Sequence, residues 1–229
     1  RQRQMCIRDR PYANFVLDNA DADYRFNLAF SASSTTNNMA ASVNDRKENQ
    51  FDLSLVTVDA SNNIDGYRLQ DPYGSGDDPA LITQLRQFKS GDPTTEAGTQ
   101  YAPVTMSSAR LMHLIIAEDA LANGDTGGFE DAINDLRDID SGYTTDYTYS
   151  AANAVEALTH HRRVNTIVMG LRLQDMFRWG IQSGDDPNTV PEAAWQSASV
   201  AVSSPGEMLP ITLIEVRANC YLNGLGCGG

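Results

Sequence analysis

Residues 107–140 have the sequence SSARLMHLIIAEDALANGDTGGFEDAINDLRDID, and residues 151–180 have the sequence AANAVEALTHHRRVNTIVMGLRLQDMFRWG. In both stretches apolar residues recur at the spacing of one face of a helix. Together they predict three helices, with the rest of the chain leading into them or folding back over them. The fold class they indicate is mainly α.

The first two of these helices are predicted to form a hairpin. Ser107 or Ser108 suits the N-cap of the first helix, and Gly124 suits the left-handed position that ends it. The second helix has acidic residues in its first turn and Arg137 near its last, as the helix dipole favours. Because only residues 125–128 connect the two helices, we expect them to pack antiparallel.

The third helix is predicted to begin near Ser150 or Asn153 and to end at Gly180. Glu156 follows Asn153 by three positions, the spacing of a capping box. Gly170 lies inside the predicted helix, where a glycine destabilises by up to about 1 kcal/mol relative to alanine. Either a neighbouring backbone packs closely against it, or the helix breaks there into two.

The composition is that of a folded acidic protein. The chain has 229 residues, 41% of them hydrophobic and 21% charged, with a formal net charge of −13. An excess of acid argues against nucleic acid or an anionic membrane surface as a partner. No run of about 18 apolar residues is present, so the sequence predicts no membrane-spanning helix.

The first ten residues, RQRQMCIRDR, differ in composition from the acidic remainder. We expect residues 1–10 to be a non-native tail, with a genuine basic arm as the alternative. In the first case the true N-terminus, with any signal peptide and lipid-accepting cysteine, is missing from this chain. The remaining chain is predicted to contain a loop-rich, ligand-facing region over 11–105. Residues 106–229 then form the helical core and C-terminal tail of the same domain.

Within the loop-rich region, alternation of apolar and polar residues predicts short strands at 24–30 and 51–57. Short helices are predicted at 39–43 and 80–89. Residues 59–101 are otherwise rich in Gly, Pro, Asn and Asp and are expected to form loops. Long loops in a compact domain are commonly functional.

These loops hold our candidate ligand contacts. A tyrosine offers a flat apolar face to a sugar ring and a hydroxyl to its rim, and Arg or Asp can hydrogen-bond to hydroxyl groups. The alternative is that the same residues are ordinary loop anchors. The predicted ligand-binding residues are Tyr67, Arg68, Asp71, Tyr73 and Tyr101.

Metal and catalytic sites are not predicted. Asp71, Asp77 and Asp78 surround a Gly-Ser-Gly turn and could offer oxygens to calcium, but their spacing does not match a calcium-binding loop, so solvated turn acids are favoured. Adjacent helical residues point about 100° apart, so His160 and His161 are not expected to chelate one ion.

No nucleophile, base and orienting group can be assembled from the sequence, so we predict a protein that is not an enzyme and needs no cofactor. Arg162, Arg172 and Arg178 are expected to hold their helix against acids such as Glu118 or Asp175. The tyrosines of the insert 141–150 either pack over the hairpin or contact a partner. Cys220 and Cys227 form a small disulfide loop or remain two free thiols.

Several motifs occur in an order that carries a family resemblance. An Ala-Glu-containing helix and an AINDLR helix are followed by an arginine-rich helix and a late L-P-I segment. This order resembles the C-terminal half of the SusD/RagB family of surface lipoproteins. The matching residues are Gly170, Arg172, Asp175, Arg178, Trp179, Gly180, Leu209, Pro210, Ile211, Glu215 and Asn219. The chain departs from the family pattern at His160, His161, Asn165, Met169 and Thr212.

The resemblance implies a partial TPR-type helical superhelix, with irregular loops and a few short strands in the N-terminal part. It implies a lipid-anchored protein on the extracellular face of the outer membrane. Such a protein captures an oligosaccharide or similar nutrient and delivers it to a SusC-like, TonB-dependent transporter. The alternative is a TPR-like scaffold that binds a protein or peptide. Sugar binding predicts aromatic residues exposed together on the loops, whereas a scaffold predicts a groove lined by helix faces.

Overall fold

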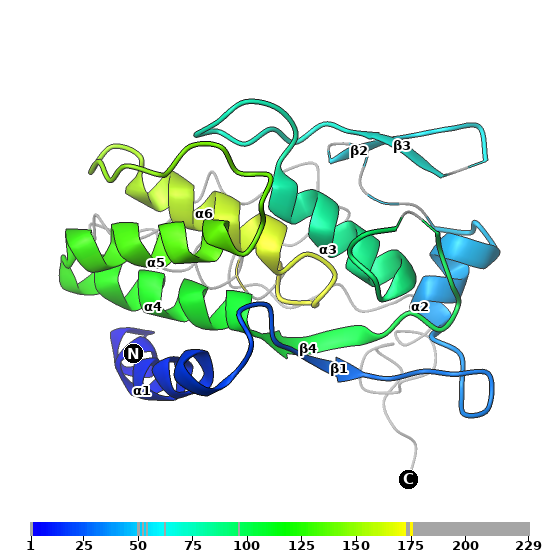
Figure 1. The fold of residues 1–229 in the computed structure, drawn as a ribbon, viewed down its shortest axis with the longest axis horizontal. Coiled ribbons are helices and arrows are strands. Elements are labelled where there is room, and N and C mark those ends of the chain that lie inside the picture. Colours follow the sequence, from blue (N-terminus) through cyan, green and yellow to red (C-terminus); the bar gives the residue numbers. More distant parts are fainter. Residues whose placement is uncertain are drawn as a thin grey trace, which may run out of the picture. The chain divides into compact units, whose positions relative to one another are not determined.

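The computed structural model describes residues 2–49, 51, 53, 55–61, 63–95, 97–172 and 175. The chain forms two compact units, Arg1–Arg172 and Leu173–Gly229, and every element given below belongs to the first. This unit is mainly α with a few short strands, as predicted (Figure 1). Several predictions lie outside the described residues, namely those on Arg178, Trp179, Gly180, Leu209, Pro210, Ile211, Glu215, Asn219, Cys220 and Cys227.

The helices are α1 (Gln2–Asn19), α2 (Asn38–Ala40), α3 (Pro79–Ser90), α4 (Ala109–Asn123), α5 (Thr126–Asp138) and α6 (Ala154–Asn165). A π-helical turn, Ala41–Asp45, continues α2. The strands are β1 (Arg25–Leu28), β2 (Val56–Val58), β3 (Ile64–Tyr67) and β4 (Val104–Ser108). They form two antiparallel pairs, β1 with β4 and β2 with β3.

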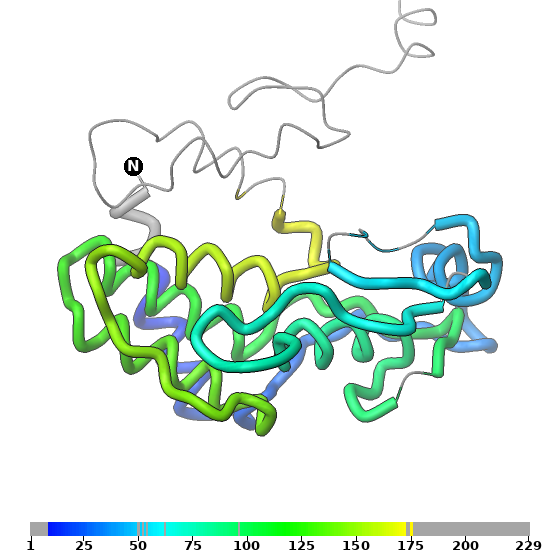
Figure 2. Tube along the Cα trace, turned by 90° about the horizontal axis from the view of Figure 1, so that it is seen from above, coloured from blue at the N-terminus to red at the C-terminus, as the bar shows by residue number. Residues whose placement is uncertain are grey.

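The predicted hairpin is present as α4 and α5, which lie side by side in Figures 1 and 2. The Ser108 hydroxyl caps α4 by accepting from the backbone N–H of Leu111 at 3.3 Å. Gly124 ends α4 with φ 72°, in the left-handed region that glycine favours. Asp125 then caps α5, accepting from the N–H of Gly128 at 2.9 Å. Because α4 ends at Gly124 and the cap of α5 follows at Asp125, the chain reverses direction in a tight turn.

The main core lies between α4, α5 and α6. It consists of Leu114, Ala117, Ala120, Leu121, Phe129, Ala132, Ile133, Leu136, Tyr147, Ala154, Ala157 and Leu158. The insert 141–150 covers this core, because Tyr147 is buried and its ring meets that of Phe129 edge-on at 5.9 Å. Tyr149 also packs against the core. Of the two alternatives for the insert, the structure therefore shows packing over the hairpin.

The third helix is shorter than predicted. α6 ends at Asn165, and Val168 and Gly170 both have positive φ values, 59° and 75°. Of the two explanations for Gly170, the break in the helix is the one found: the backbone leaves the helical region before Gly170, and a Cβ there would meet no atom within 4 Å. A single helix as far as Gly180 is therefore wrong. The capping box is also wrong. The Asn153 side chain accepts from the N–H of Ser150 and the hydroxyl of Tyr147 rather than capping α6.

A second core lies under the β2–β3 pair, where α3 contributes Ala80, Leu81 and Leu85. α3 confirms the short helix predicted at 80–89. The strand predicted at 51–57 is shorter and later, as β2. The strand β3 was not predicted, because its residues, Ile-Asp-Gly-Tyr, alternate too briefly to stand out from a loop.

The β1–β4 pair links the N-terminal segment to α4. β1 confirms the strand predicted at 24–30, and the register shifts between Phe26 and Asn27. Residues 2–10, which stand apart by composition, form the first half of α1. α1 packs along α4, with Arg10 Nη1 2.9 Å from Asp119 Oδ2. Among the helices described, none is both long and apolar enough to cross a bilayer.

We predict that Leu114→Ala lowers the free energy of unfolding by about 2–5 kcal/mol, because it removes a fully buried side chain from the centre of the core. Urea denaturation measures the change. Asp131→Ala, at an exposed position of α5, is the matched control and should change it by less than about 0.5 kcal/mol. Equal effects of the two substitutions would contradict the assignment of this core.

Candidate functional site

A cleft of about 540 Å³ opens between α3, the turn that follows α5 and the segment that follows α3. Its lining residues are Asp23, Pro79, Ile82, Thr83, Arg86, Pro93, Thr94, Arg110, Ile139, Asp140, Ser141 and Gly142. Ligand sites for small molecules commonly have volumes of roughly 300–1,000 Å³. The cleft is therefore large enough for one or two sugar units or a molecule of similar size.

A buried guanidinium forms part of the lining of this cleft. Arg110 is fully buried, and its Nε donates to Asp23 Oδ1 at 2.8 Å. Its two terminal nitrogens donate to the two carboxylate oxygens of Asp140, and Nη1 also donates to Asn165 Oδ1 at 3.0 Å. We call Arg110, Asp23, Asp140 and Asn165 the arginine centre.

The arginine centre joins four segments of the chain. Arg110 lies in the first turn of α4, Asp140 follows α5, Asn165 ends α6, and Asp23 precedes β1. α3 joins them as well, because the Thr83 hydroxyl donates to Asp140 Oδ1 at 2.7 Å. Each of these contacts requires its element to begin or end at the right residue, so the caps of the helices position the site.

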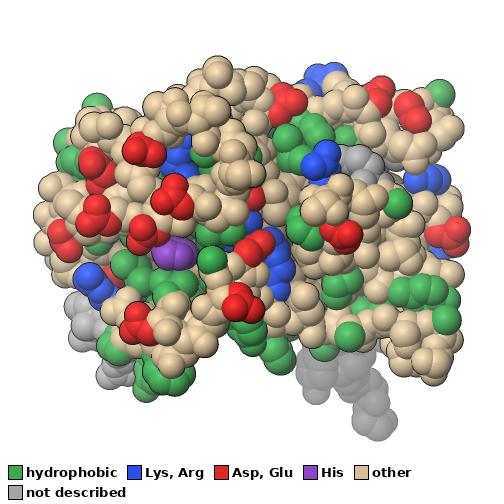
Figure 3. All heavy atoms as spheres, in the orientation of Figure 1, with side chains coloured by type: hydrophobic (Ala, Val, Ile, Leu, Met, Phe, Trp, Pro, Cys, Tyr) green, Lys and Arg blue, Asp and Glu red, His purple; other side chains and the backbone are tan. Residues whose placement is uncertain are grey.

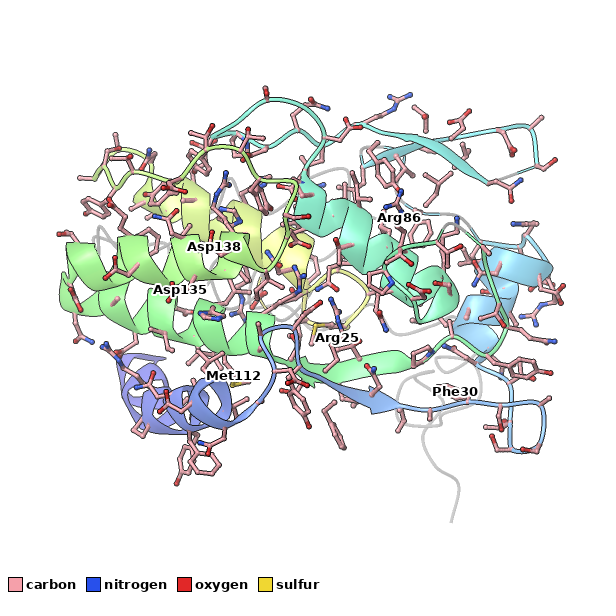
Figure 4. All side chains as sticks on the ribbon, viewed as in Figure 1. Arg25, Phe30, Arg86, Met112, Asp135 and Asp138 are labelled. Carbon is pink, nitrogen blue, oxygen red and sulfur yellow. The ribbon has the colours of Figure 1, made fainter. Side chains whose placement is uncertain are left out.

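A second cation lies close to the arginine centre. Arg25, labelled in Figure 4, pairs with Asp23 at 2.9 Å and also donates to the Gln84 side chain. Burial lowers the pKa of Arg25, against the attraction of Asp23. Burial acts in the same direction on Arg110, but hydrogen bonds to Asp140 and Asp23 raise the pKa of Arg110 above its ordinary value. Arginine does not lose its proton in proteins, so both guanidinium groups are cations, and the carboxyl groups of Asp23 and Asp140 lie against them.

The lining of the cleft mixes polar and apolar groups. Thr83, Thr94 and Ser141 provide hydroxyl groups, and Arg86, labelled on α3 in Figure 4, provides a guanidinium. Two isoleucines and two prolines of the lining provide apolar surface. On the face drawn in Figure 3, acidic side chains gather at the left, over α4 and α5, and acidic and basic side chains lie next to one another near the centre. The arrangement suits a ligand that forms many hydrogen bonds and carries little net charge.

The structure places the predicted ligand residues elsewhere. Asp71 is buried and forms a two-pronged ion pair with Arg137, with distances of 3.0 and 2.9 Å. The backbone N–H of Tyr73 donates to Asp71 Oδ1, so these two predicted residues do lie together. The Tyr73 ring packs against the main core, and burial raises the pKa of its hydroxyl.

The other three predicted residues are spread over the unit. Tyr67 packs against the second core, and Arg68 is exposed after β3. Tyr101 is half-buried, in a segment whose neighbours Gln100 and Ala102 accept hydrogen bonds from Asn37. Among the residues that the structure describes around the cleft, none of the five predicted residues lines it. Asp71, Tyr73 and Tyr67 pack or pair within the fold, as expected of loop anchors.

Two of the three turn acids are not solvated, contrary to the prediction. Asp78 is fully buried, caps α3 by accepting from the N–H of Leu81, and accepts a hydrogen bond from the Tyr143 hydroxyl. Asp71 pairs with Arg137, and only Asp77 is exposed. The physical reason is that buried cations and helix N-termini require carboxylates, and this turn provides them.

The adjacent histidines serve different neighbours. His160 Nε2 lies 2.7 Å from Asp78 Oδ2, whereas His161 points into the interior and is fully buried. Burial alone would raise the pKa of Asp78, but the hydrogen bond with His160 holds that pKa below its ordinary value. Arg162 lies 3.7 Å from Glu118, which confirms the predicted partner.

Sequence analysis missed the arginine centre and Arg137. A usable signal exists, since Arg110 stands in register with the apolar positions Leu114, Ala117 and Leu121 of α4. A charged residue at a core-facing position needs a buried carboxylate as partner. The sequence does not tell which of the 30 acidic residues provides it.

We predict that Arg110→Met lowers the free energy of unfolding by about 3–5 kcal/mol, because it leaves the carboxylates of Asp23 and Asp140 without their buried counter-charge. The matched control is Arg46→Met, which removes an ion pair with exposed partners and should change stability by less than about 1 kcal/mol. Chemical denaturation of both variants measures the two changes in the free energy of unfolding. A small effect at Arg110 would show that the centre contributes little to folding.

We also predict that Gly74→Ala is destabilising by about 1–3 kcal/mol. A Cβ atom at this position would come too close to Asp71 Oδ2, which cannot move without weakening its pair with Arg137. Gly127→Ala is the control, because a Cβ there meets no atom within 4 Å in the first turn of α5. Thermal unfolding of both variants measures the effects, and Gly127→Ala should be neutral or slightly stabilising.

Comparison of the chain with protein-family models, with curated proteins and with solved structures gives no significant match.

Proposed function

We propose that this chain is a non-catalytic binding protein that captures an oligosaccharide or a similar hydroxyl-rich nutrient in the cleft beside α3. The observation that carries the proposal is the cleft itself. It has a volume of about 540 Å³, walls of mixed polar and apolar character, and a buried arginine paired with carboxylates within the protein.

Internal charge balance favours a neutral ligand. Arg110 is neutralised by Asp23 and Asp140, so the charges in this part of the lining are already paired before a ligand arrives. The hydroxyls and the Arg86 guanidinium in the walls can exchange hydrogen bonds with sugar hydroxyls at a modest desolvation cost. The residues described around the cleft include no aromatic side chain, so the exposed aromatic cluster that sugar binding predicts is not found there. Apolar contact with a sugar ring would come from Pro79, Ile82 and Pro93.

The same pairing favours binding over catalysis. The two carboxylates of the cleft hold Arg110, and a carboxylate tied to a guanidinium is a poor general base. His160 and His161 lie next to Asp78 and Tyr73 and are not among the lining residues. The proposal therefore includes no bond-breaking step.

The resemblance to the SusD/RagB family extends this proposal to location and partner. The α4–α5 hairpin followed by α6 is the arrangement that a partial TPR-type superhelix requires. Under this proposal the protein is anchored by lipid to the extracellular face of the outer membrane. There it passes its ligand to a TonB-dependent, SusC-like transporter.

A helical scaffold for a protein or peptide is the second candidate. Large apolar side chains are exposed on α1 and on the β1–β4 pair, among them Tyr12, Phe15, Phe26 and Met106. Exposed apolar surface of this kind is typical of protein contacts. The cleft favours small-ligand capture, because its walls come from helix ends and loops rather than from a concave row of helix faces.

The test is calorimetric titration with a panel of malto-, xylo-, manno- and galacto-oligosaccharides. We predict that at least one of them binds, and that Arg86→Ala weakens its affinity about 10- to 100-fold, since a hydrogen bond to a charged group contributes roughly 1.5–3 kcal/mol. Ser141→Trp, which fills the cleft from an exposed position of its rim, should abolish binding.

Arg46→Ala removes an exposed arginine outside the cleft and is the control that should keep the wild-type affinity. Binding that persists in Ser141→Trp would place the ligand elsewhere on the chain. Failure of every sugar in the panel, with the protein folded by circular dichroism, would favour the scaffold alternative.

A further inference from the structure

Residues 68–78 form a closed loop between β3 and α3, which we call the 68–78 loop. Its ends are joined by the hydrogen bond from the N–H of Asp78 to the carbonyl of Leu69, at 3.0 Å, and by that from the Gln70 amide to Asp77, at 2.7 Å. These hydrogen bonds within the loop do not depend on its contacts with the helical body.

Ionisable side chains fasten this loop to the body. Asp71 binds Arg137 of α5 through two hydrogen bonds, and both side chains are buried. At the other end of the loop, Asp78 is bonded to the Tyr143 hydroxyl at 2.9 Å and to His160 at 2.7 Å. The Arg137 guanidinium also lies 4.0 Å from the centre of the Tyr143 ring, which connects the two attachment points.

His161 lies beneath the loop and is fully buried. Its ring stacks on Tyr73 at 6.1 Å and meets the rings of Tyr143 and His160 at 6.2 and 5.3 Å. Neither ring nitrogen has a hydrogen-bond partner among the described residues. A proton on this ring would be buried without a bonded counter-charge and near the positive charge of Arg137.

We propose that His161 makes the 68–78 loop an acid-sensitive latch, closed while the imidazole is neutral and released when the imidazole takes up a proton. Release allows water to reach the ring, which the closed loop prevents. The two hydrogen bonds between Asp71 and Arg137 resist release. The ionisable groups around the ring are Asp71, Tyr73 and Asp78 from the loop, Arg137 from α5, Tyr143 and Tyr147 from the insert, and His160 from α6.

The direction of the pH dependence follows from which state binds the proton. Burial lowers the pKa of His161 to about 3 in the closed state, against an ordinary value of 6.5 that the opened loop restores. The closed state is therefore fully stable above pH 6.5 and loses stability as the pH falls toward 3. Burial would raise the pKa of Asp78, but its hydrogen bond with His160 in the closed state lowers that pKa as well.

Release of the loop also affects the cleft. Asp78 is the N-cap of α3, and Pro79, Ile82 and Thr83 of that helix line the cleft. Loss of the cap loosens the first turn of α3 and with it one wall of the cleft. Weaker ligand binding at acid pH follows if the proposed function is correct, whereas the latch itself does not rest on that function.

Hydrogen–deuterium exchange of the wild-type protein tests the latch. With the exchange rate corrected for its intrinsic pH dependence, a peptide over 68–78 should show about a 30-fold rise in opening between pH 7.5 and pH 5.0. A peptide from α4 should change much less. Equal changes in both peptides would mean global unfolding and would overturn the proposal.

His161→Phe keeps an aromatic ring against Tyr73 and removes the titrating nitrogens, so the rise in opening should disappear. The matched control is His113→Phe, at a half-buried position of α4 away from the loop, which should keep the rise. An acid response that persists in His161→Phe overturns the proposal.

A measurement on the unmodified chain keeps the test valid if His161→Phe does not fold. Nitrogen chemical shifts of the His161 ring, followed by NMR, should show a neutral imidazole at pH 5.0. A ring that titrates near its ordinary pKa while the 68–78 loop remains protected would contradict the latch.

Discussion

A guanidinium that is fully buried must find its counter-charges inside the protein, and Arg110 finds them on segments from both ends of the described unit. Asp23 comes from the segment before β1, and Asp140 from the turn after α5. The caps at Ser108 and Gly124 set the length and position of α4, and thereby the place of Arg110. The same contacts shape the cleft, because the two carboxylates that bind Arg110 also line it.

Buried charge is used a second time, at the pair of Asp71 and Arg137. Apolar packing alone is non-directional, and the alanine-rich interface of α4, α5 and α6 would tolerate small shifts. The two-pronged pairs add direction, since a guanidinium and a carboxylate bind well in few orientations. The helical core therefore provides the free energy of folding, and the arginines fix where the polar loops lie upon it.

The sequence predicted those parts of the fold whose cause is local. The hairpin of α4 and α5 follows from apolar spacing together with Ser108 and Gly124, which lie within one turn of the ends of α4. α3 was predicted over 80–89 without its cap, Asp78. The end of α6 could not be predicted, because the apolar pattern continues past Asn165 where the backbone does not. The anchoring role of Asp71 was hidden for a related reason. Its partner Arg137 lies 66 residues away, and nothing near either residue encodes that distance.

The arginine centre also limits how this sequence can change over evolutionary time. Asp23 and Asp140 lie 87 and 30 residues from Arg110, yet none of the three is independent of the others. Loss of any one leaves a buried charge uncompensated, whereas joint replacement by apolar residues of similar volume can be nearly neutral. We therefore expect selection to remove single substitutions at these three positions and to tolerate coordinated triple substitutions. Among descendants of this chain the three positions should either persist together or disappear together.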